Sequence, residues 1–305
     1  MKKFLTQLLT LHWLTGRRFV IGIPYLWLLI VFLVPFLIVL RISVADVQSA
    51  ADPFGSLISF DDGLLMLKVK IANYLFIAED SLYLLTYLSS LKYAAVTTVL
   101  CLLIGYPFAY FIARARPAIR PTLLMLVMLP FWTSFLLRIY AWKGILATNG
   151  LLNNLLIALG LIDTPLMLLH TPFSLVIGMV YAYLPFMILP LYANLVKMDI
   201  RFLEAAADLG ATPWQTFWRI TVPLSKSGII AGSMLVLIPC VGEFVIPELL
   251  GGPETLMIGR VLWDEFFSNN DWPMASSVTV IMILLILFPM AIFNKYQARQ
   301  QEGDA

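Results

Sequence analysis

Charged residues, cysteine and histidine are all scarce in this sequence. Of its 305 residues, only 12% are charged and 61% are hydrophobic. So few charges cannot cover the surface of an ordinary water-soluble domain of this length. The composition therefore predicts an all-α polytopic membrane protein, because a helix satisfies its own backbone hydrogen bonds in lipid.

The scarce polar groups also exclude several kinds of chemistry. Cys101 and Cys240 each fall inside an apolar run, which indicates neither a disulfide framework nor a thiolate metal site. His12 and His170 lie far apart and in no metal-binding motif. The phosphate-binding pattern G-x-x-x-x-G-K-[ST] is absent, so this chain is not expected to bind ATP itself. We expect no metal, no cofactor and no catalytic residue, which makes a membrane enzyme the least favoured class.

Long apolar runs with at most one charged residue each predict six membrane-spanning helices. They cover about 20–40, 93–113, 121–142, 172–195, 228–247 and 272–294. The first run is long enough for a hydrocarbon core of about 30 Å. It is too long for the apolar region of a signal peptide, and Arg41 follows it without a cleavage pattern.

The uncharged stretch 144–162 is a candidate for a seventh span. We reject it because Asn149, Gly150, Asn153 and Asn154 would be costly in lipid. A seventh crossing would also move the polar loop after the fourth span to the outside. The stretch is therefore expected to form an external, interfacial helix.

The distribution of charge gives the orientation. With both termini inside, the basic residues on the cytoplasmic side are Lys2, Lys3, Arg17, Arg18, Arg114, Arg116, Arg120, Lys197, Arg201, Arg219, Lys226, Lys295 and Arg299. Most acids then lie outside, and this bias has the sign of the positive-inside rule. The predicted order is a cytoplasmic segment 1–19, a first span 20–40, a periplasmic loop 41–92, a transmembrane domain 93–294 and a cytoplasmic tail 295–305.

A polar interruption at 199–227 separates the fourth and fifth spans. Its first part favours a short helix, and Gly210 can take the left-handed conformation that ends one. Thr212, Pro213 and Gln215 then fit a capping box at the start of a second helix. The residues predict a helical hairpin that docks on a partner, although an ordinary polar loop is an alternative on composition alone.

The spacing within this hairpin is similar to the EAA loop of ABC-importer permeases, E-A-A-x3-G-x9-I-x-L-P. The matching residues are Glu204, Ala205, Ala206, Gly210, Ile220 and Pro223. Val222 replaces the usual Leu and keeps an apolar side chain. The resemblance implies that the hairpin is the cytoplasmic coupling element that sits in a cleft of the ATP-hydrolysing subunit.

Glu243 is an acid within the predicted fifth span. A buried acid is costly unless it faces a partner or an aqueous path, so we assign it to the substrate path, with a structural ion pair to Arg138 or Arg260 as the alternative. Aromatic side chains that could hold an ammonium group are Tyr181, Tyr183, Tyr140 and Trp142. For Trp142 a place in the aromatic belt at the membrane boundary is an equal alternative.

Three longer stretches, 129–142, 180–192 and 232–267, resemble the polyamine-importer permeases, the putrescine type first and the spermidine type next. This resemblance implies a type I ABC-importer permease in the bacterial inner membrane. It also implies a second related permease, two copies of an ATPase and a periplasmic polyamine-binding protein as partners. ATP and magnesium would be bound by the ATPase.

Other functions stay open from the residues alone. The same architecture could carry another small solute, such as an amino-acid derivative, thiamine or ferric ion. An ion-coupled secondary transporter would use Glu243 as a proton or sodium site. The coupling-loop pattern argues against that class.

Overall fold

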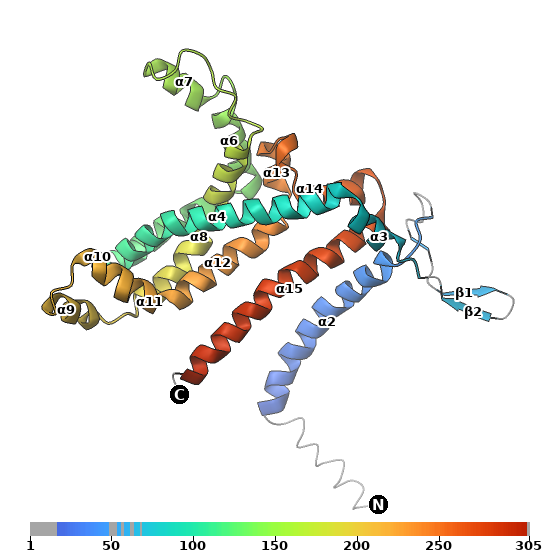
Figure 1. Cartoon of the computed structure of the whole chain (residues 1–305), viewed down its shortest axis with the longest axis horizontal. Helices are drawn as coiled ribbons and strands as arrows, with labels where there is room; N and C mark the ends of the chain where they lie inside the picture. The colour runs from blue at the N-terminus through green and yellow to red at the C-terminus, as the bar shows by residue number, and fades with distance from the viewer. Residues whose placement is uncertain (1–16, 49–53, 56–57, 62–63, 68, 304–305) are drawn as a thin grey trace, which may run out of the picture. The chain divides into compact units, whose positions relative to one another are not determined.

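A computed structural model describes residues 17–48, 54–55, 58–61, 64–67 and 69–303 (Figure 1). The predictions for Lys2, Lys3 and His12 lie outside the described residues, as do most of the segment 1–19 and the last residues of the tail. The chain divides into two compact units. One contains residues 1–76 and 265–281, and the other contains residues 77–264 and 282–305.

The smaller unit begins with helix α2 (Arg17–Ser43), which contains the predicted first span. Next along the chain are strands β1 (Ile58–Asp61) and β2 (Leu64–Leu67), which pair as an antiparallel hairpin that the sequence did not predict. Two hydroxyl groups form hydrogen bonds with Ser43, the last residue of α2. Tyr74 donates to the Ser43 hydroxyl at 2.7 Å, and Ser277 donates to the Ser43 carbonyl at 2.9 Å.

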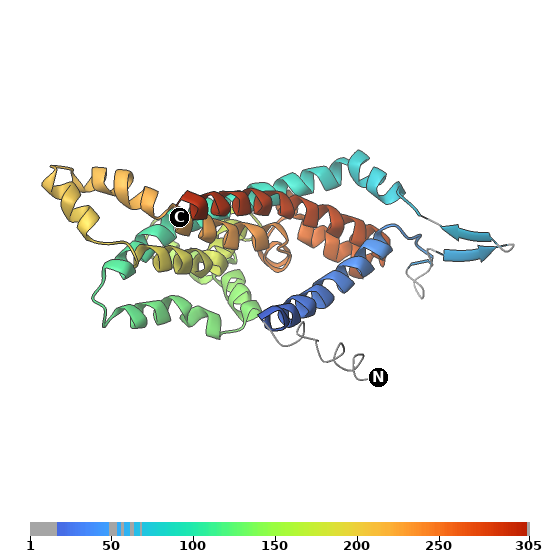
Figure 2. The same ribbon diagram turned by 90° about the horizontal axis from the view of Figure 1, so that it is seen from below.

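Three long helices form the core of the larger unit: α4 (Ser81–Arg114), α8 (Pro172–Leu195) and α12 (Lys226–Val241). They pack side by side, as the two views agree (Figures 1 and 2). The fully buried side chains between them include Leu175, Met179, Met187, Leu191, Val236 and Cys240. The predicted fourth span agrees with α8 in both of its ends.

Helix α4 begins earlier than the sequence predicted. Residues 81–92, assigned above to an external loop, are helical because the Asp80 carboxylate accepts the Leu82 N–H at 2.8 Å and caps the new end. Lys92 does not stop the helix, since its ammonium lies over the Tyr93 ring, 5.4 Å from the centroid. The prediction that this helix starts at residue 93 is wrong.

The predicted third span is broken rather than continuous. It consists of α5 (Arg120–Met128), a 3-10 turn η1 (Leu129–Trp132) and α6 (Phe135–Leu146), with a bend of 85° after η1. Pro130 has no N–H, and its carbonyl accepts the Thr133 hydroxyl at 2.7 Å, so the chain leaves the helix here.

The stretch 144–162 forms no single helix of membrane-spanning length. It contains the end of α6 and the short helix α7 (Leu151–Ala158). Buried Asn153 holds the following loop, because its side chain exchanges hydrogen bonds with the backbone of Leu166 at 2.9 and 3.0 Å. An interfacial position for α7 stays a prediction.

The prediction that the fifth span is one continuous helix is also wrong. Helix α12 ends at Val241, α13 (Val245–Leu250) follows, and Glu243 lies between them. The chain continues through η3 (Pro253–Thr255), α14 (Ile258–Trp263) and η4 (Asp264–Ser268) to α15 (Trp272–Gly303).

Among the described residues, four helices are long and apolar enough to cross a membrane. The number rises to six if each of two bent helix pairs counts as one span. The six-span topology and the orientation of the termini therefore stay predictions.

Close packing of α12 on α8 depends on Gly232. A Cβ atom at this position would lie 2.8 Å from the Met187 sulfur and 3.1 Å from the Met187 carbonyl oxygen. Small residues allow helix backbones to approach in this way in membrane proteins.

We predict that Gly232→Val lowers the free energy of unfolding by about 1–3 kcal/mol, because the added side chain forces the two helices apart. Thermal unfolding of the purified protein in detergent measures the loss. Gly144→Val is the matched control, since a Cβ there meets nothing within 4 Å. Equal stability of the two variants would contradict the packing role.

Candidate functional site

The helical hairpin predicted at 199–227 is present. Helix α9 (Arg201–Asp208) ends two residues before Gly210, whose φ of +80° lies in the left-handed region. Helix α10 (Pro213–Thr216) then begins with a capping box. The Thr212 hydroxyl accepts the Gln215 N–H at 3.3 Å, and the Gln215 side chain accepts the Thr212 N–H at 3.0 Å. The local prediction of both helix ends is confirmed.

The residues of the EAA pattern are spread over this hairpin and the turns after it. Glu204, Ala205, Gly210 and Pro223 are exposed, Ala206 is buried and Ile220 is half-buried in the π-helical turn η2 (Phe217–Thr221). The short helix α11 (Val222–Leu224) follows η2.

Large apolar side chains surround the pattern and point away from the chain's own core. The exposed ones are Ile200, Phe202, Leu209, Trp214 and Trp218. A polar loop that exposes several large apolar residues together is typical of a protein interaction site. The hairpin can therefore dock on another subunit.

The hairpin is joined to α4 by aromatic contacts. The Phe217 ring meets the edges of Tyr106 and Tyr110, with centroids 5.4 and 6.3 Å apart. The Tyr106 hydroxyl also hydrogen-bonds the Ser225 hydroxyl at 2.8 Å. These contacts hold η2 and Ser225 against the last turns of α4.

An exposed ion pair stands at the start of α9. The Asp199 carboxylate lies 2.6 Å from the Arg201 guanidinium and accepts the Arg201 N–H at 2.9 Å. These hydrogen bonds hold the pKa of Asp199 below its usual range. Solvent screens the pair, so its main effect is to fix the first turn of α9.

The second candidate site is centred on Glu243, in the break between α12 and α13. Its side chain is buried, and all of its hydrogen bonds come from neutral donors. The Tyr183 hydroxyl donates to one carboxylate oxygen. The other oxygen accepts the N–H groups of Val245 and Ile246 at 3.0 and 3.4 Å, which caps α13.

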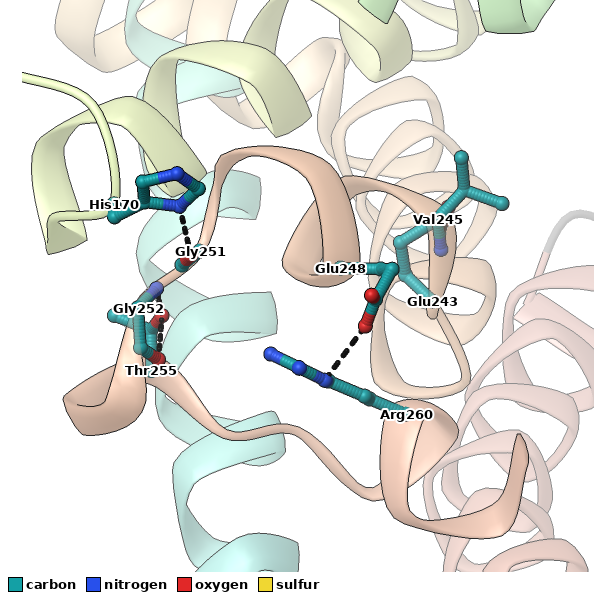
Figure 3. Close-up of polar contacts among 8 residues, drawn as sticks. All are labelled: His170, Glu243, Val245, Glu248, Gly251, Gly252, Thr255 and Arg260. Carbon is teal, nitrogen blue, oxygen red and sulfur yellow. Dashed lines mark hydrogen bonds and ion pairs between the residues drawn. The ribbon is translucent and has the colours of Figure 1, made fainter. Parts of the chain in front are cut away.

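The structural alternative for Glu243 is not observed. Arg260 pairs instead with Glu248 at 2.7 Å, as Figure 3 shows. The Arg138 guanidinium lies over the Phe131 ring, 4.9 Å from its centroid. Glu243 therefore has no cationic partner among the described residues.

The other predicted aromatic residues fall in different places. Trp142 and Tyr181 meet edge to face with centroids 5.5 Å apart. Tyr140 is exposed on α6 and joins neither this pair nor the carboxylate. Of the four aromatic residues predicted, the structure brings only Tyr183 to Glu243.

Sequence reasoning missed the polar groups that position the segment after α13. Ser174 donates to the Leu250 carbonyl at 2.7 Å, and His170 Nδ1 lies 2.8 Å from the Gly251 carbonyl (Figure 3). A Cβ on Gly252 would collide with the His170 carbonyl. The pair Gly251 and Gly252 was the available signal, since adjacent glycines often mark a close backbone approach.

No cluster of three or more His, Cys, Asp or Glu side chains that could hold a metal occurs in the described part of the chain. The chemistry available at the two sites is therefore docking and the recognition of charge.

An apolar helical core with span-length helices, a buried carboxylate and an exposed apolar hairpin fits a transport subunit of a membrane. The family model described as "Binding-protein-dependent transport system inner membrane component" matches residues 101–302. The chain belongs to this family and is an inner-membrane transport permease.

Several curated relatives carry the name spermidine/putrescine transport system permease protein PotB. The protein from Haemophilus influenzae is 40% identical, covering 93% of this chain and 94% of its own. The protein from Escherichia coli K12 is 46% identical, covering 68% of this chain and 77% of its own.

A solved bacterial ABC transporter for alginate import has the same fold, with a TM-score of 0.61 at 18% identity over 95% of this chain and 98% of its own. The MetNI methionine ABC transporter matches with a TM-score of 0.53 at 15% identity, over 70% of this chain and 93% of its own. These neighbours confirm the predicted ABC-importer permease fold.

We predict that Gly210→Val opens the hairpin, because a β-branched residue is strained at positive φ by about 1–3 kcal/mol. Hydrogen exchange of residues 201–216 should become roughly 5- to 100-fold faster, as that loss of local stability requires. A Cβ at Gly210 meets no atom within 4 Å, so crowding inside the chain cannot explain the result.

Gly210→Asn is the matched control, since Asn tolerates the left-handed conformation. It should exchange nearly as slowly as the natural protein. Equally fast exchange in both variants would show that φ is not the cause.

Proposed function

We propose that this chain is the permease subunit of an ATP-driven importer that moves polyamines, putrescine or spermidine or both, from the periplasm to the cytoplasm. One observation carries the cargo: the buried Glu243 carboxylate has hydrogen-bond donors, but no cation lies beside it among the residues that the structure describes. The names of the PotB relatives from Haemophilus influenzae and Escherichia coli support the same cargo.

The exposed hairpin is proposed to couple transport to ATP hydrolysis. Its apolar side chains, with Trp214 and Leu209 the most exposed, would fill a cleft of an ATPase subunit. Two copies of that ATPase would bind ATP and magnesium. A second, related permease completes the pathway, and a periplasmic polyamine-binding protein delivers the cargo.

Glu243 is proposed to meet the cargo inside the membrane. A buried anion without a counter-charge is costly, and an ammonium group of a polyamine would offset that cost. The Tyr183 hydroxyl would hold the carboxylate until the ammonium arrives. The ring centroid of Phe186 lies 6.1 Å from that of Tyr183 and 5.3 Å from that of Phe131. Aromatic rings therefore line one side of the Glu243 site.

The cap on α13 links binding to movement in this proposal. The carboxylate that would receive the ammonium also accepts the Val245 and Ile246 N–H groups. A shift of the carboxylate toward the cargo weakens this cap and loosens the break between α12 and α13. Bending at this break would open or close the path.

We predict vanadate-sensitive uptake of labelled putrescine or spermidine by proteoliposomes that contain this chain, its ATPase, the second permease and the binding protein. The two initial rates compare the cargoes. An assembly that hydrolyses ATP normally but ignores both polyamines would retain the importer and reject the cargo. Vanadate-insensitive uptake by this chain alone would indicate a secondary transporter.

A second prediction concerns Glu243→Gln. The amide still accepts the N–H groups that begin α13, so assembly should persist, but the charge is gone and polyamine uptake should fall by about 100-fold. Uptake and co-purification of the subunits measure the two effects separately.

Glu254→Gln is the matched control, because Glu254 is an exposed acid in the segment after α13 and takes part in none of the ion pairs found among the described residues. It should keep most of the uptake. Normal uptake by Glu243→Gln would remove this residue from the substrate path.

A further inference from the structure

An apolar groove lies between α4, α5 and α8, and neither Glu243 nor Tyr183 lines it. Its volume is about 370 Å³, and Tyr181 and Pro185 line it from α8. Phe111 on α4 and Leu126 on α5 line other walls, and their side chains are 64% and 55% exposed. The groove therefore opens outward and has the size of a ligand pocket.

One end of this groove carries concentrated positive charge. Arg114 ends α4 one turn after Phe111, and Arg120 begins α5 one turn before Leu123, which also lines the groove. Residues three apart share a face of a helix. Both arginines therefore continue the walls of the groove, and Arg116 lies in the turn between them.

None of these three arginines has an acidic partner among the described residues. The ion pairs found there are Lys70–Asp46, Arg201–Asp199 and Arg260–Glu248. Arg114 lies over the Tyr110 ring at 5.5 Å, and one of its terminal nitrogens is buried with no hydrogen-bond partner. Arg120 uses its Nε for the Ala115 carbonyl at 2.9 Å. The positive charge is left uncompensated.

We propose that this groove and its arginine turn bind one anionic phospholipid. An acyl chain would lie among Phe111, Leu126 and Tyr181, and the phosphate would contact Arg114 and Arg120. Basic pockets between membrane helices bind anionic headgroups for this reason. The family membership of the chain puts such lipids around it.

Charge complementarity selects the lipid over other occupants. A helix of a second subunit could fill the apolar groove but would not by itself neutralise three arginines. A free phosphate ion would neutralise the charge but leave the apolar walls exposed. Only a molecule with both an anionic head and a long apolar tail matches both features.

The site also adjoins the coupling hairpin. Arg114 lies over Tyr110, and the Tyr110 ring meets Phe217 of the hairpin with centroids 6.3 Å apart. A lipid held here would fix the end of α4 on which η2 packs.

Native mass spectrometry of the complete detergent-purified assembly tests the proposal by titration with phosphatidylglycerol. The double variant Arg114→Gln/Arg120→Gln should bind it about 25-fold more weakly, or roughly fivefold for each arginine. The matched control Arg41→Gln/Lys143→Gln removes the same charge elsewhere and should bind as the natural protein does.

A second variant changes the groove without changing the charge. Leu126→Trp fills the groove and should weaken binding, whereas Leu137→Trp, on an equally exposed part of α6, should not. Thermal unfolding checks that each variant is folded. This pair keeps the test valid if the double arginine variant fails to assemble.

Four outcomes would overturn the proposal. The first is equal binding of phosphatidylcholine, and the second is competition by inorganic phosphate at the same strength. The third is unchanged lipid affinity in both the double arginine variant and Leu126→Trp. The fourth is a crosslink from the variant Leu126→Cys to a second permease that excludes lipid. The second outcome would make this a phosphate site, and the last would make it a subunit interface.

Discussion

Hydrocarbon offers no hydrogen-bond partner, so each helix break inside the apolar core must be satisfied by a side chain of the protein. The larger unit does this at three helix ends between α12 and α14. Glu243 accepts the N–H groups that open α13, Ser174 donates to the Leu250 carbonyl that closes it, and Ser90 accepts the Ile258 N–H at the start of α14. Two of these three residues come from the long helices α4 and α8, which are intact there.

This requirement explains why one carboxylate can serve both structure and transport. Glu243 has donors enough to stay in place, but they are neutral, so its charge remains available. A carboxylate paired with Arg260 would be stable and inert. Arg260 is paired with Glu248, and Glu243, the buried acid in the described part of the core, faces a tyrosine instead. The proposed polyamine path depends on these pairings, in which, among the described residues, Glu248 takes Arg260 and Glu243 takes only Tyr183 and backbone N–H groups.

The hairpin and the arginine turn lie at the same end of the larger unit, since Phe217 packs on Tyr106 and Tyr110 in the last turns of α4. Positive charge and the proposed ATPase contact thus share one end of this unit, as the positive-inside rule predicts for a cytoplasmic face. The same contacts give the proposed lipid a position from which it could affect coupling.

Much of this protein is determined by sequence alone, wherever neighbours in the chain decide the outcome. The α8 span, the left-handed Gly210 and the capping box of Thr212 and Gln215 were all predictable, because they depend on residues a few positions apart. The family could also be predicted, since the EAA pattern lies in one short stretch of sequence. Tertiary structure alone decided where α5 and α12 break, that Tyr183 rather than an arginine meets Glu243, and that Tyr140 is left out. A helix ends inside a membrane only where side chains can satisfy its freed backbone. For Leu250 and Ile258 those side chains are Ser174 and Ser90, which are far away in the sequence, and local sequence does not say that they will be there.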